Sequence, residues 1–406
     1  MSSLYRPAAD WELAGIIADA SAGRVPVEII AGGTKREIGR PVEAAAQISV
    51  RGMIGVMLYE PNELVMGVRA GTTVAEVEGL LAKSGQMLPF EPLDLGPLLG
   101  REAGQGTIGA VFATNFSGAR RVYSGAARDH LLGVRAITGH GEQIRAGGRV
   151  MKNVTGYDVG RGLAGSWGTL AVMTEVTFKV VPQPEATATL ALFGLPDEIG
   201  VEVLCKAMGT PYEITGALHL QQVPTTRLWQ SQIRGPGKSA TVMRLEAPAT
   251  SIAYRTEKLR QLFKAYGELT VIDTAPSLEF WQEMRTLTVM QGSTNPLWRI
   301  STPPKRGPEV VAAIARYMAV EAVYDWSGGL IWLEVPASAD AGATDIRRVI
   351  ALHGGHATLI RATAAVRGAV EVFQPLDPGV DRLTRGLKQA FDPAGVLNRG
   401  RMYASM

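Results

Sequence analysis

The sequence predicts a protein of the α+β class that is built from more than one domain. Its 406 residues are more than a single small hydrophobic core can organise. As far as residue 181, helix-type and strand-type patterns alternate and are separated by glycine turns. Beyond Glu185, strands and helices follow one another in the manner of an antiparallel α+β module. The two halves of the chain are therefore expected to differ in architecture.

Apolar periodicity and capping residues predict the first elements. A helix is expected over residues 10–20, with Asp10 as its N-cap. A second helix is expected over residues 73–83, because Thr73 and Glu76 have the spacing of a capping box. Short apolar and β-branched runs between the two helices predict strands over residues 25–30, 48–50, 55–59 and 64–70.

The middle of the first half is expected to contain a loop, one buried element and several strands. Residues 90–104 are rich in proline, glycine and leucine and predict a loop between two lobes. Residues 108–114 are compatible with a buried helix or with the start of a strand. Strands are expected over residues 131–138, 142–146 and 169–181, the first two forming a hairpin around Gly139-His140-Gly141.

The second half begins after Pro182-Gln183-Pro184, which marks a boundary. Strands are predicted there over residues 187–193, 217–222, 240–245, 330–335 and 357–361. Helices are predicted over residues 197–208, 251–266, 346–353 and 381–391.

Composition excludes several classes of protein. The 41 basic and 38 acidic residues leave a net charge of +3, which does not indicate a nucleic-acid-binding surface. The single cysteine, Cys205, excludes an internal disulfide or a cysteine-ligated metal centre and fits a reducing compartment. The N-terminus lacks a signal-peptide layout, and no apolar run reaches the roughly eighteen residues of a transmembrane helix. Membrane contact is therefore expected only through a partner.

Glycine clusters carry the main functional signal. The run from Gly106 to Gly118 combines glycines with hydroxyl and amide side chains, which suits a surface close to a flat polar ligand. Residues 31–35 follow a strand and form either an anion-binding nest of N–H groups or a plain tight turn. Further clusters span residues 147–158 and 165–170. None of them matches the dinucleotide fingerprint or the P-loop in full, so a standard Rossmann NAD domain is not expected.

In combination these segments resemble the FAD-binding domain of the vanillyl-alcohol oxidase family, also called the PCMH-type flavoprotein fold. The resemblance rests on residues 27–34, 68–76, 106–118, 128–129, 165–177 and the tail 391–398. Within that family, residues 152–158, 355–359 and 401–403 are similar to the FAD-binding E subunits of bacterial glycolate oxidase. Arg399 departs from the pattern, because the family tail commonly has proline there.

The resemblance implies an architecture of three consecutive parts. Residues 1–184 would form a PCMH-type FAD-binding domain of two α/β lobes. Residues 185–375 would form a smaller α+β cap domain, and residues 376–406 would return to pack on the FAD-binding domain.

The resemblance also implies the cofactor, FAD, and the residues that hold it. They comprise the pyrophosphate loop, the flavin–ribityl side and one strand position: Ala31, Gly32, Gly33, Thr34, Lys35, Gly106, Thr107, Ile108, Gly109, Thr114, Asn115, Ser117, Gly118 and Val172. Many relatives attach FAD covalently through a histidine of the pyrophosphate loop. Since this loop has no histidine, FAD is expected to be bound non-covalently.

No catalytic residue is identified with the same clarity. Lys152, His356 and Arg361 are candidates for a role beside the flavin or the substrate, and a solvated or structural role is the alternative for each. His353 and His356 are close in sequence, but the two glycines between them disfavour a metal site on a helix. No metal is expected.

The implied function is that of the FAD-binding subunit of a complex that oxidises glycolate to glyoxylate. Its expected partners are a second flavoprotein subunit and an iron–sulfur subunit that passes electrons to quinone. One alternative is a self-sufficient FAD-dependent 2-hydroxy acid dehydrogenase, for example for D-lactate, and another is a flavin-free scaffold. The expected location is cytoplasmic, with peripheral contact to the inner membrane made through partner subunits.

Overall fold

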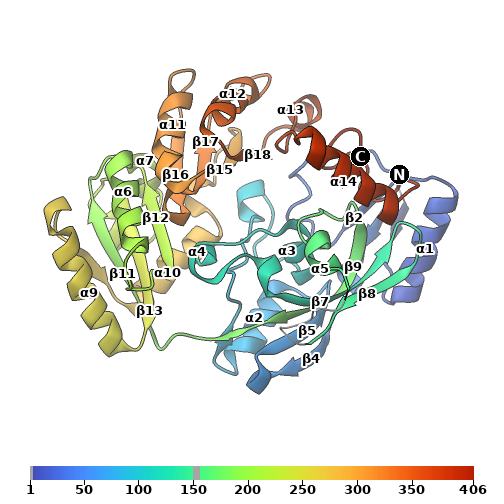
Figure 1. Ribbon diagram of the computed structural model, residues 1–406, viewed down its shortest axis with the longest axis horizontal. Helices are drawn as coiled ribbons and strands as arrows, with labels where there is room; N and C mark the ends of the chain where they lie inside the picture. The colour runs from blue at the N-terminus through green and yellow to red at the C-terminus, as the bar shows by residue number, and fades with distance from the viewer. Residues whose placement is uncertain (1–2, 150–155) are drawn as a thin grey trace.

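The chain folds into two large parts that lie side by side in Figure 1. The structure is a computed structural model, and it describes residues 3–149 and 156–406. The part at the right of Figure 1 contains the two ends of the chain, and the part at the left contains its middle. Within the described ranges, none of the helices has the length and apolar composition that spanning a membrane requires.

The first lobe is built on a three-stranded parallel sheet. Its strand order is β1 (Ser3–Tyr5), β3 (Ala46–Ser49), β2 (Val27–Ile30), and helix α1 (Asp10–Ala22) buries Leu13 and Ile17 beside it. The prediction of Asp10 as the N-cap was wrong, because the cap position is Ala9. The Glu12 carboxylate accepts the N–H groups of Ala8 and Ala9, which leaves Asp10 free to pair with Arg69 at 2.7 Å.

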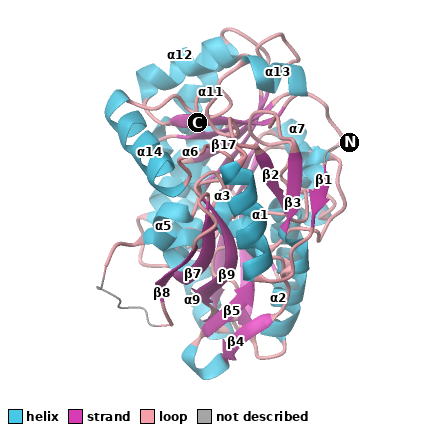
Figure 2. Ribbon diagram, turned by 90° about the vertical axis from the view of Figure 1, so that its right-hand side faces the viewer, coloured by secondary structure: helices cyan, strands magenta, loops and turns pink. Residues whose placement is uncertain are grey.

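The second lobe is a five-stranded antiparallel sheet, which lies below the first sheet in Figure 2. The strand order is β4 (Val56–Glu60), β5 (Val65–Arg69), β9 (Ala171–Lys179), β7 (Leu131–Thr138), β8 (Gln143–Gly147). The predicted hairpin is confirmed, since β7 and β8 pair directly. Its core is closed by helices α2 (Val74–Ala82), α3 (Ile108–Thr114) and α5 (Val159–Leu163).

Two sequence predictions about these helices are settled by the structure. Residues 108–114 are a helix, because the Thr107 hydroxyl caps the N–H of Ala110 and starts it. The capping box of α2 is confirmed: Thr73 Oγ1 accepts the N–H of Glu76 at 3.1 Å, and the Glu76 carboxylate accepts the N–H of Thr73 at 2.9 Å. Strand β6 (Gln86–Met87) pairs with β10 (Val181–Pro182), and α4 (Arg121–Ser124) follows the glycine-rich run.

The other part is an eight-stranded antiparallel sheet with helices packed against it. The strand order is β14 (Thr270–Ile272), β11 (Ala186–Phe193), β13 (Ala240–Ala247), β12 (Gly216–Leu220), β16 (Glu321–Asp325), β17 (Leu330–Glu334), β15 (Leu297–Ser301), β18 (His356–Arg361). The helices are α6 (Asp197–Met208), α7 (Gln222–Thr226), α8 (Ser231–Arg234), α9 (Ala249–Phe263), α10 (Thr274–Arg285), α11 (Gly307–Ala315) and α12 (Ala343–His353).

The two faces of this sheet have different neighbours, as the alternation of side chains along a strand requires. On one face, Leu190 and Met243 pack with residues of α6 and α9. On the other face, Leu218 and Val242 belong to a core that also contains Phe116 and Trp167 from the first part. The second face of the sheet therefore lies against the glycine-rich half of the chain.

The C-terminal segment returns to the first lobe. After α13 (Ala364–Ala369) and α14 (Pro378–Phe391), Leu397 forms a parallel bridge with Val27 of β2. The Val27 N–H donates to Val396 at 2.9 Å, and the Asn398 N–H donates to Val27 at 3.0 Å. The C-terminal segment thus pairs with β2 of the sheet in the first lobe.

Candidate cofactor site

A cleft lies where the two lobes and the C-terminal segment meet. Clefts between structural units are common sites for organic cofactors. The cleft is lined by residues of β2 and the loop after it, of α3, of β9 and of the tail: Ile29, Ile30, Ala31, Gly32, Gly33, Thr34, Lys35, Arg36, Val50, Ala70, Gly109, Ala110, Ala113, Thr114, Ser166, Trp167, Gly168, Ala171, Val172, Met173, Asn398 and Arg401.

The loop after β2 forms one end of the cleft. Gly33 has a φ of 74°, which glycine adopts without strain. A Cβ on Gly32 would lie 1.7 Å from the carbonyl oxygen of Gln105, so this position admits no side chain. Among the described residues, the N–H groups from Gly32 to Lys35 donate to no protein acceptor. Four successive free N–H groups make a nest for an anion such as a diphosphate.

Helix α3 forms one wall, and it closely approaches the residue that follows β5. The Gly109 N–H donates to the carbonyl of Ala70 at 2.9 Å, and a Cβ on Gly109 would lie 2.6 Å from the Cβ of Ala70. A glycine is therefore required at this contact. The next turns of the helix place Ala113 and Thr114 along the cleft.

The opposite wall is closed by Asn398 of the C-terminal tail. Its side-chain Oδ1 accepts the N–H of Ile29 at 2.8 Å, and its Nδ2 donates to the carbonyl of Trp167 at 2.7 Å. Trp167 and Gly168 both have positive φ, 56° and 69°, so the chain turns sharply here. The tail thus ties β2 to the turn before β9.

Two buried cations lie at the loop end of the cleft. Burial lowers the pKa of Lys35 to about 8, although the charge of Asp94 opposes this effect. Burial also lowers the pKa of Arg401 to about 10, and its Nη2 donates to the carbonyls of Lys35 and Arg36 at 2.9 and 3.0 Å. A buried cation favours a nearby anion, because the anion restores the lost solvation. The donor set therefore fits the diphosphate of FAD.

The structure brings more than half of the predicted cofactor residues to this cleft. Ala31, Gly32, Gly33, Thr34, Lys35, Gly109, Thr114 and Val172 line it. Gly106, Thr107, Ile108, Asn115, Ser117 and Gly118 do not line it.

The contacts of this second group fix the two ends of α3 and the loop that follows it. Thr107 caps α3, and the buried Ser117 hydroxyl accepts the N–H of Ala127 at 3.0 Å. Asn115 ends α3 with a φ of 53° and accepts the N–H of Arg128 at 3.0 Å. The carbonyl of Gly118 accepts the indole N–H of Trp326 at 3.1 Å.

Of the three candidate catalytic residues, two do not line the cleft and one lies outside the described residues. Lys152 lies outside the described residues. Arg361 is buried and its guanidinium donates to the Glu334 carboxylate at 2.5 Å and to the carbonyls of Asn295 and Met290. These contacts give Arg361 a structural role that joins β18 to its neighbours. His356 is exposed at the start of β18.

Residues 3–149 and 156–406 contain no cluster of three or more histidine, cysteine, aspartate or glutamate side chains suited to a metal ion. The cleft offers backbone N–H groups, two cations and apolar walls instead.

Comparison with known proteins identifies the family. A family profile described as an FAD binding domain matches residues 2–147. The glycolate oxidase subunit GlcE of Escherichia coli K12 is 36% identical over 384 residues, which cover 94% of each chain. The chain belongs to the GlcE family. As a GlcE-family member it is a flavoprotein of the FAD-linked oxidoreductases, with FAD as its cofactor.

Two more distant relatives are a glycolate oxidase subunit and a D-lactate dehydrogenase. The glycolate oxidase subunit GlcD of Bacillus subtilis is 23% identical over 97% of this chain and 87% of its own length. A D-lactate dehydrogenase of Archaeoglobus fulgidus is 30% identical, over 47% of this chain and 41% of its own length. The chain is thus also similar, over part of its length, to an enzyme named for a 2-hydroxy acid.

Solved structures confirm the PCMH-type fold of this GlcE-family chain. p-Cresol methylhydroxylase matches with a TM-score of 0.72 at 13% identity, over 99% of this chain and 88% of its own. Alkyldihydroxyacetonephosphate synthase matches with a TM-score of 0.71 at 16% identity, over 97% of this chain and 75% of its own. At such identities the likeness concerns the fold alone.

Sequence reasoning missed Trp167, Asn398 and Arg401 as lining residues of the cleft. A signal for all three was present, since residues 165–177, 391–398 and 401–403 carried part of the family resemblance. Their role depends on a contact between segments more than 200 residues apart in the chain, Asn398 and Trp167. No local pattern reports such a contact.

Proposed function

We propose that this chain is the FAD-binding subunit of a complex that oxidises glycolate to glyoxylate. In this proposal a second flavoprotein subunit and an iron–sulfur subunit are its partners, and electrons pass through the iron–sulfur subunit to quinone. The observation that carries the proposal is the complete cofactor cleft, closed by Asn398, in a member of the GlcE family. We further propose a cytoplasmic location, with membrane contact through the partners.

The residues of the cleft would hold FAD in a defined orientation. The free N–H groups of residues 32–35 and the Lys35 ammonium would bind the diphosphate. The apolar wall of Ala113, Trp167 and Val172 would exclude water from the rings. Bound FAD supplies hydride acceptance, and the protein supplies binding, orientation and electrostatics.

We propose that FAD is held non-covalently. In support, the lining residues of the cleft include no histidine, cysteine or tyrosine among the described residues. Acid precipitation of the purified protein should release a yellow supernatant and leave a colourless pellet. Flavin that stays with the pellet after washing would contradict non-covalent binding.

The domain division into residues 1–184, 185–375 and 376–406 also remains our proposal. Its support is the change of sheet between β10, which ends at Pro182, and β11, which begins at Ala186. Limited proteolysis of the FAD-loaded protein should cut near residue 184 before it cuts inside either sheet. Early cutting within β11 or β9 would count against this boundary.

A second candidate function is a self-sufficient dehydrogenase of 2-hydroxy acids such as D-lactate. It is favoured by the relatives named D-lactate dehydrogenase, the first of which is 30% identical over 47% of this chain. The two functions differ in whether the isolated chain turns over.

The deciding experiment measures dye reduction by the FAD-loaded chain alone and by the chain co-purified with its partner subunits, with glycolate and with D-lactate. Glycolate oxidation only by the assembly supports the subunit function. Full turnover by the isolated chain would replace it with the second candidate.

A further inference from the structure

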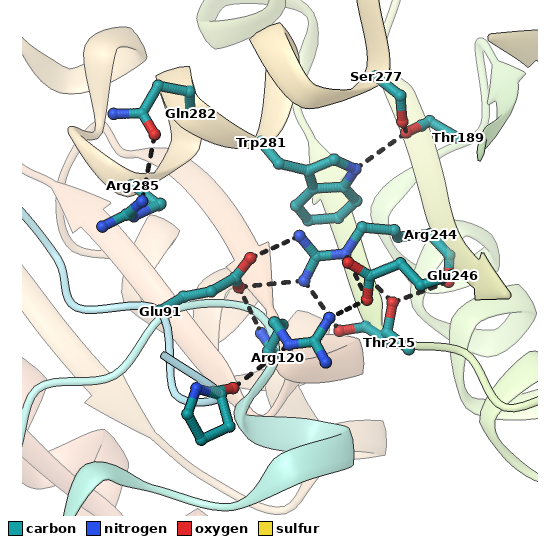
Figure 3. A network of polar contacts seen from close by, with 12 residues as sticks. Glu91, Arg120, Thr189, Thr215, Arg244, Glu246, Ser277, Trp281, Gln282 and Arg285 are labelled. Carbon is teal, nitrogen blue, oxygen red and sulfur yellow. Dashed lines mark hydrogen bonds and ion pairs between the residues drawn. The ribbon is translucent and has the colours of Figure 1, made fainter. Parts of the chain in front are cut away.

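Four charged residues lie between the two parts of the molecule, and they form two ion pairs. Arg244 on β13 pairs with Glu91 at 2.6 Å, and Arg120 pairs with Glu246. Figure 3 shows the four side chains pointing toward one another, with Arg244 lying against the ring of Trp281. Each arginine here has its own carboxylate.

Two further arginines at the same interface differ from this group. Arg121 directly follows Arg120, and Arg299 lies on β15 of the eight-stranded sheet. Their guanidinium carbons lie 4.2 and 5.1 Å from the centroid of the same ring, Trp326. In the described part of the chain, neither guanidinium forms an ion pair within 4 Å or a hydrogen bond. The Nε of Arg299 is buried and without a partner.

The charge of this pair is only partly balanced. Burial, and then the charge of Arg121, lowers the pKa of Arg299 to about 10, so both arginines are charged at neutral pH. Asp325 is the acidic group near both arginines, and its carboxylate accepts the N–H of Trp326 at 2.6 Å. Asp129 also lies near Arg121, but it pairs with Arg128 at 3.8 Å. Burial raises the pKa of Asp325 to about 7, so it is only partly ionised at neutral pH. The interface therefore has an excess of positive charge.

The stacking of the two arginines leaves their hydrogen-bonding edges available. A guanidinium that lies over an aromatic ring satisfies its face through the cation–π interaction. Its N–H groups point outward in the plane, in the fork that matches a carboxylate. Two such forks around one ring suit a small planar oxyanion.

The position of the pair relates it to the cofactor cleft. Arg299 lies 5.4 Å from the ring centroid of Phe116, and Phe116 packs edge-on against Trp167 at 5.5 Å between centroids. Trp167 lines the cleft. Phe116 and Trp167 thus connect Arg299 to the lining of the cofactor cleft by direct contacts.

Neighbouring polar groups lie on the same face of the sheet. Arg299 pairs in register with Thr358, and His356 is two residues away on the same strand, β18. Side chains two apart on a strand share a face. Although His356 is exposed as a residue, partial desolvation of its ring, and then the charges of Arg299 and Arg121, lower its pKa. His356 is therefore mostly neutral at pH 7 and available as a hydrogen-bonding group.

We propose that Arg121 and Arg299 form a subsite on this chain for the carboxylate of a small 2-hydroxy acid. The inference rests on the proposed glycolate-oxidising function and goes further, because it places substrate recognition on this subunit rather than on its flavoprotein partner. The two arginines bind and orient the acid beside the flavin.

The test measures binding of oxalate by titration calorimetry to the FAD-loaded protein in a low-chloride buffer. Oxalate has the planar carboxylates of the substrate and no oxidisable hydroxyl. R299Q and R121Q should each weaken oxalate binding about tenfold or more, the usual effect of losing a charge-assisted hydrogen bond. R299K keeps the charge and should retain part of the affinity.

The matched control is R260Q, because Arg260 lies on α9 in an exposed pair with Glu257. It should bind oxalate like the wild type. The visible flavin spectrum and the melting temperature of each variant verify that the fold is intact. If R299Q is unstable, R299K and R121Q carry the test.

Two results would overturn the subsite. One is unchanged oxalate binding in both R121Q and R299Q, and the other is a wild-type protein that retains FAD but binds no oxalate. Equal displacement by chloride would also overturn it, since the site would then be a general anion site.

Turnover of the assembled complex separates this inference from the proposed function. Glycolate oxidation by an R299Q complex with an unchanged KM would overturn the subsite while the proposed function stands. Arginine-dependent oxalate binding in a complex that does not oxidise glycolate would overturn the proposed function and leave an acid-binding site.

Discussion

At the scale of single residues, the cofactor cleft depends on positions where a side chain would collide with backbone. Gly32 is the clearest case, since its missing Cβ leaves room for the carbonyl of Gln105. A collision with backbone cannot be relieved by a rotamer change, so the loop itself would have to move. The free N–H groups from Gly32 to Lys35 would then be displaced from the positions that form the anion nest.

We therefore expect Gly32→Ala to abolish FAD retention. The protein should purify with little or no visible flavin absorbance relative to its protein absorbance. Gly15→Ala is the matched control, because a Cβ at that position in α1 meets nothing within 4 Å. A yellow Gly32→Ala protein with a normal flavin content would show that the loop tolerates the change.

Lys35 is the second residue whose surroundings predict a measurable effect. Its pKa is about 8 in the folded protein and 10.5 ordinarily. Between these values the unfolded chain binds more protons, so the free energy of unfolding of the FAD-free protein rises with pH. The rise from this one group is no more than about 3 kcal/mol.

Lys35→Met should remove that rise and stabilise the FAD-free protein at pH 7, while it weakens FAD binding. Urea unfolding at pH 7 and pH 10 measures the first effect, and flavin titration measures the second. Lys83→Met, at the exposed end of α2, should change neither quantity. A lysine without a role in the cleft would leave both measurements of Lys35→Met like those of this control.

Residue patterns predicted the candidate site only where the cause is local. The turn at Gly32-Gly33 follows a strand, and this order is visible in the sequence. The requirement for glycine at 32 comes from Gln105, however, and the requirement at 109 comes from Ala70. Arg361 was a candidate for substrate contact, and its partner Glu334 lies on a strand that only the folded sheet brings beside it.

At the scale of secondary structure, local signals predicted most of the fold. The capping box of α2 and the β7–β8 hairpin are encoded by neighbouring residues and appear as expected. The order of the eight-stranded sheet was not predicted, because it does not follow the order of the strands in the sequence. For example, β14 pairs at one edge with β11 rather than with β13 or β15. The prediction of Asp10 as an N-cap was wrong, because its carboxylate pairs with Arg69, far along the chain, and the cap position is Ala9.

Thr73→Ala tests the capping box. The substitution removes the hydroxyl that accepts the N–H of Glu76, and we expect a loss of about 1 kcal/mol in the free energy of unfolding. Thr73→Ser keeps the hydroxyl and should lose much less. Chemical denaturation of the three proteins makes the comparison, and an equal loss in both variants would attribute the effect to the methyl group.

At the scale of the whole molecule, the buried charges of Figure 3 join the two parts. Glu91 and Arg120 come from one part, and Arg244 and Glu246 come from the other. Burial alone would raise the pKa of Glu91, but Arg244 and Arg120 together hold it below its ordinary value. A carboxylate held in this way is costly to leave without its partner.

Arg244→Met should therefore destabilise the protein by roughly 3–5 kcal/mol, because it removes the ion-pair partner of the buried Glu91 carboxylate. The double variant Glu91→Met, Arg244→Met should lose less than the sum of the two single variants. Unfolding free energies of the four proteins form the cycle. Strict additivity would mean that the pair contributes no coupling.

The contacts of Asn398 also decide what a shortened chain would lack. Asn398 joins Ile29 to Trp167, so one wall of the cleft is built by residues far from the glycine loop in the sequence. A prematurely terminated chain without Asn398 would keep the glycine loop and lose this wall. We therefore expect such a chain to be colourless.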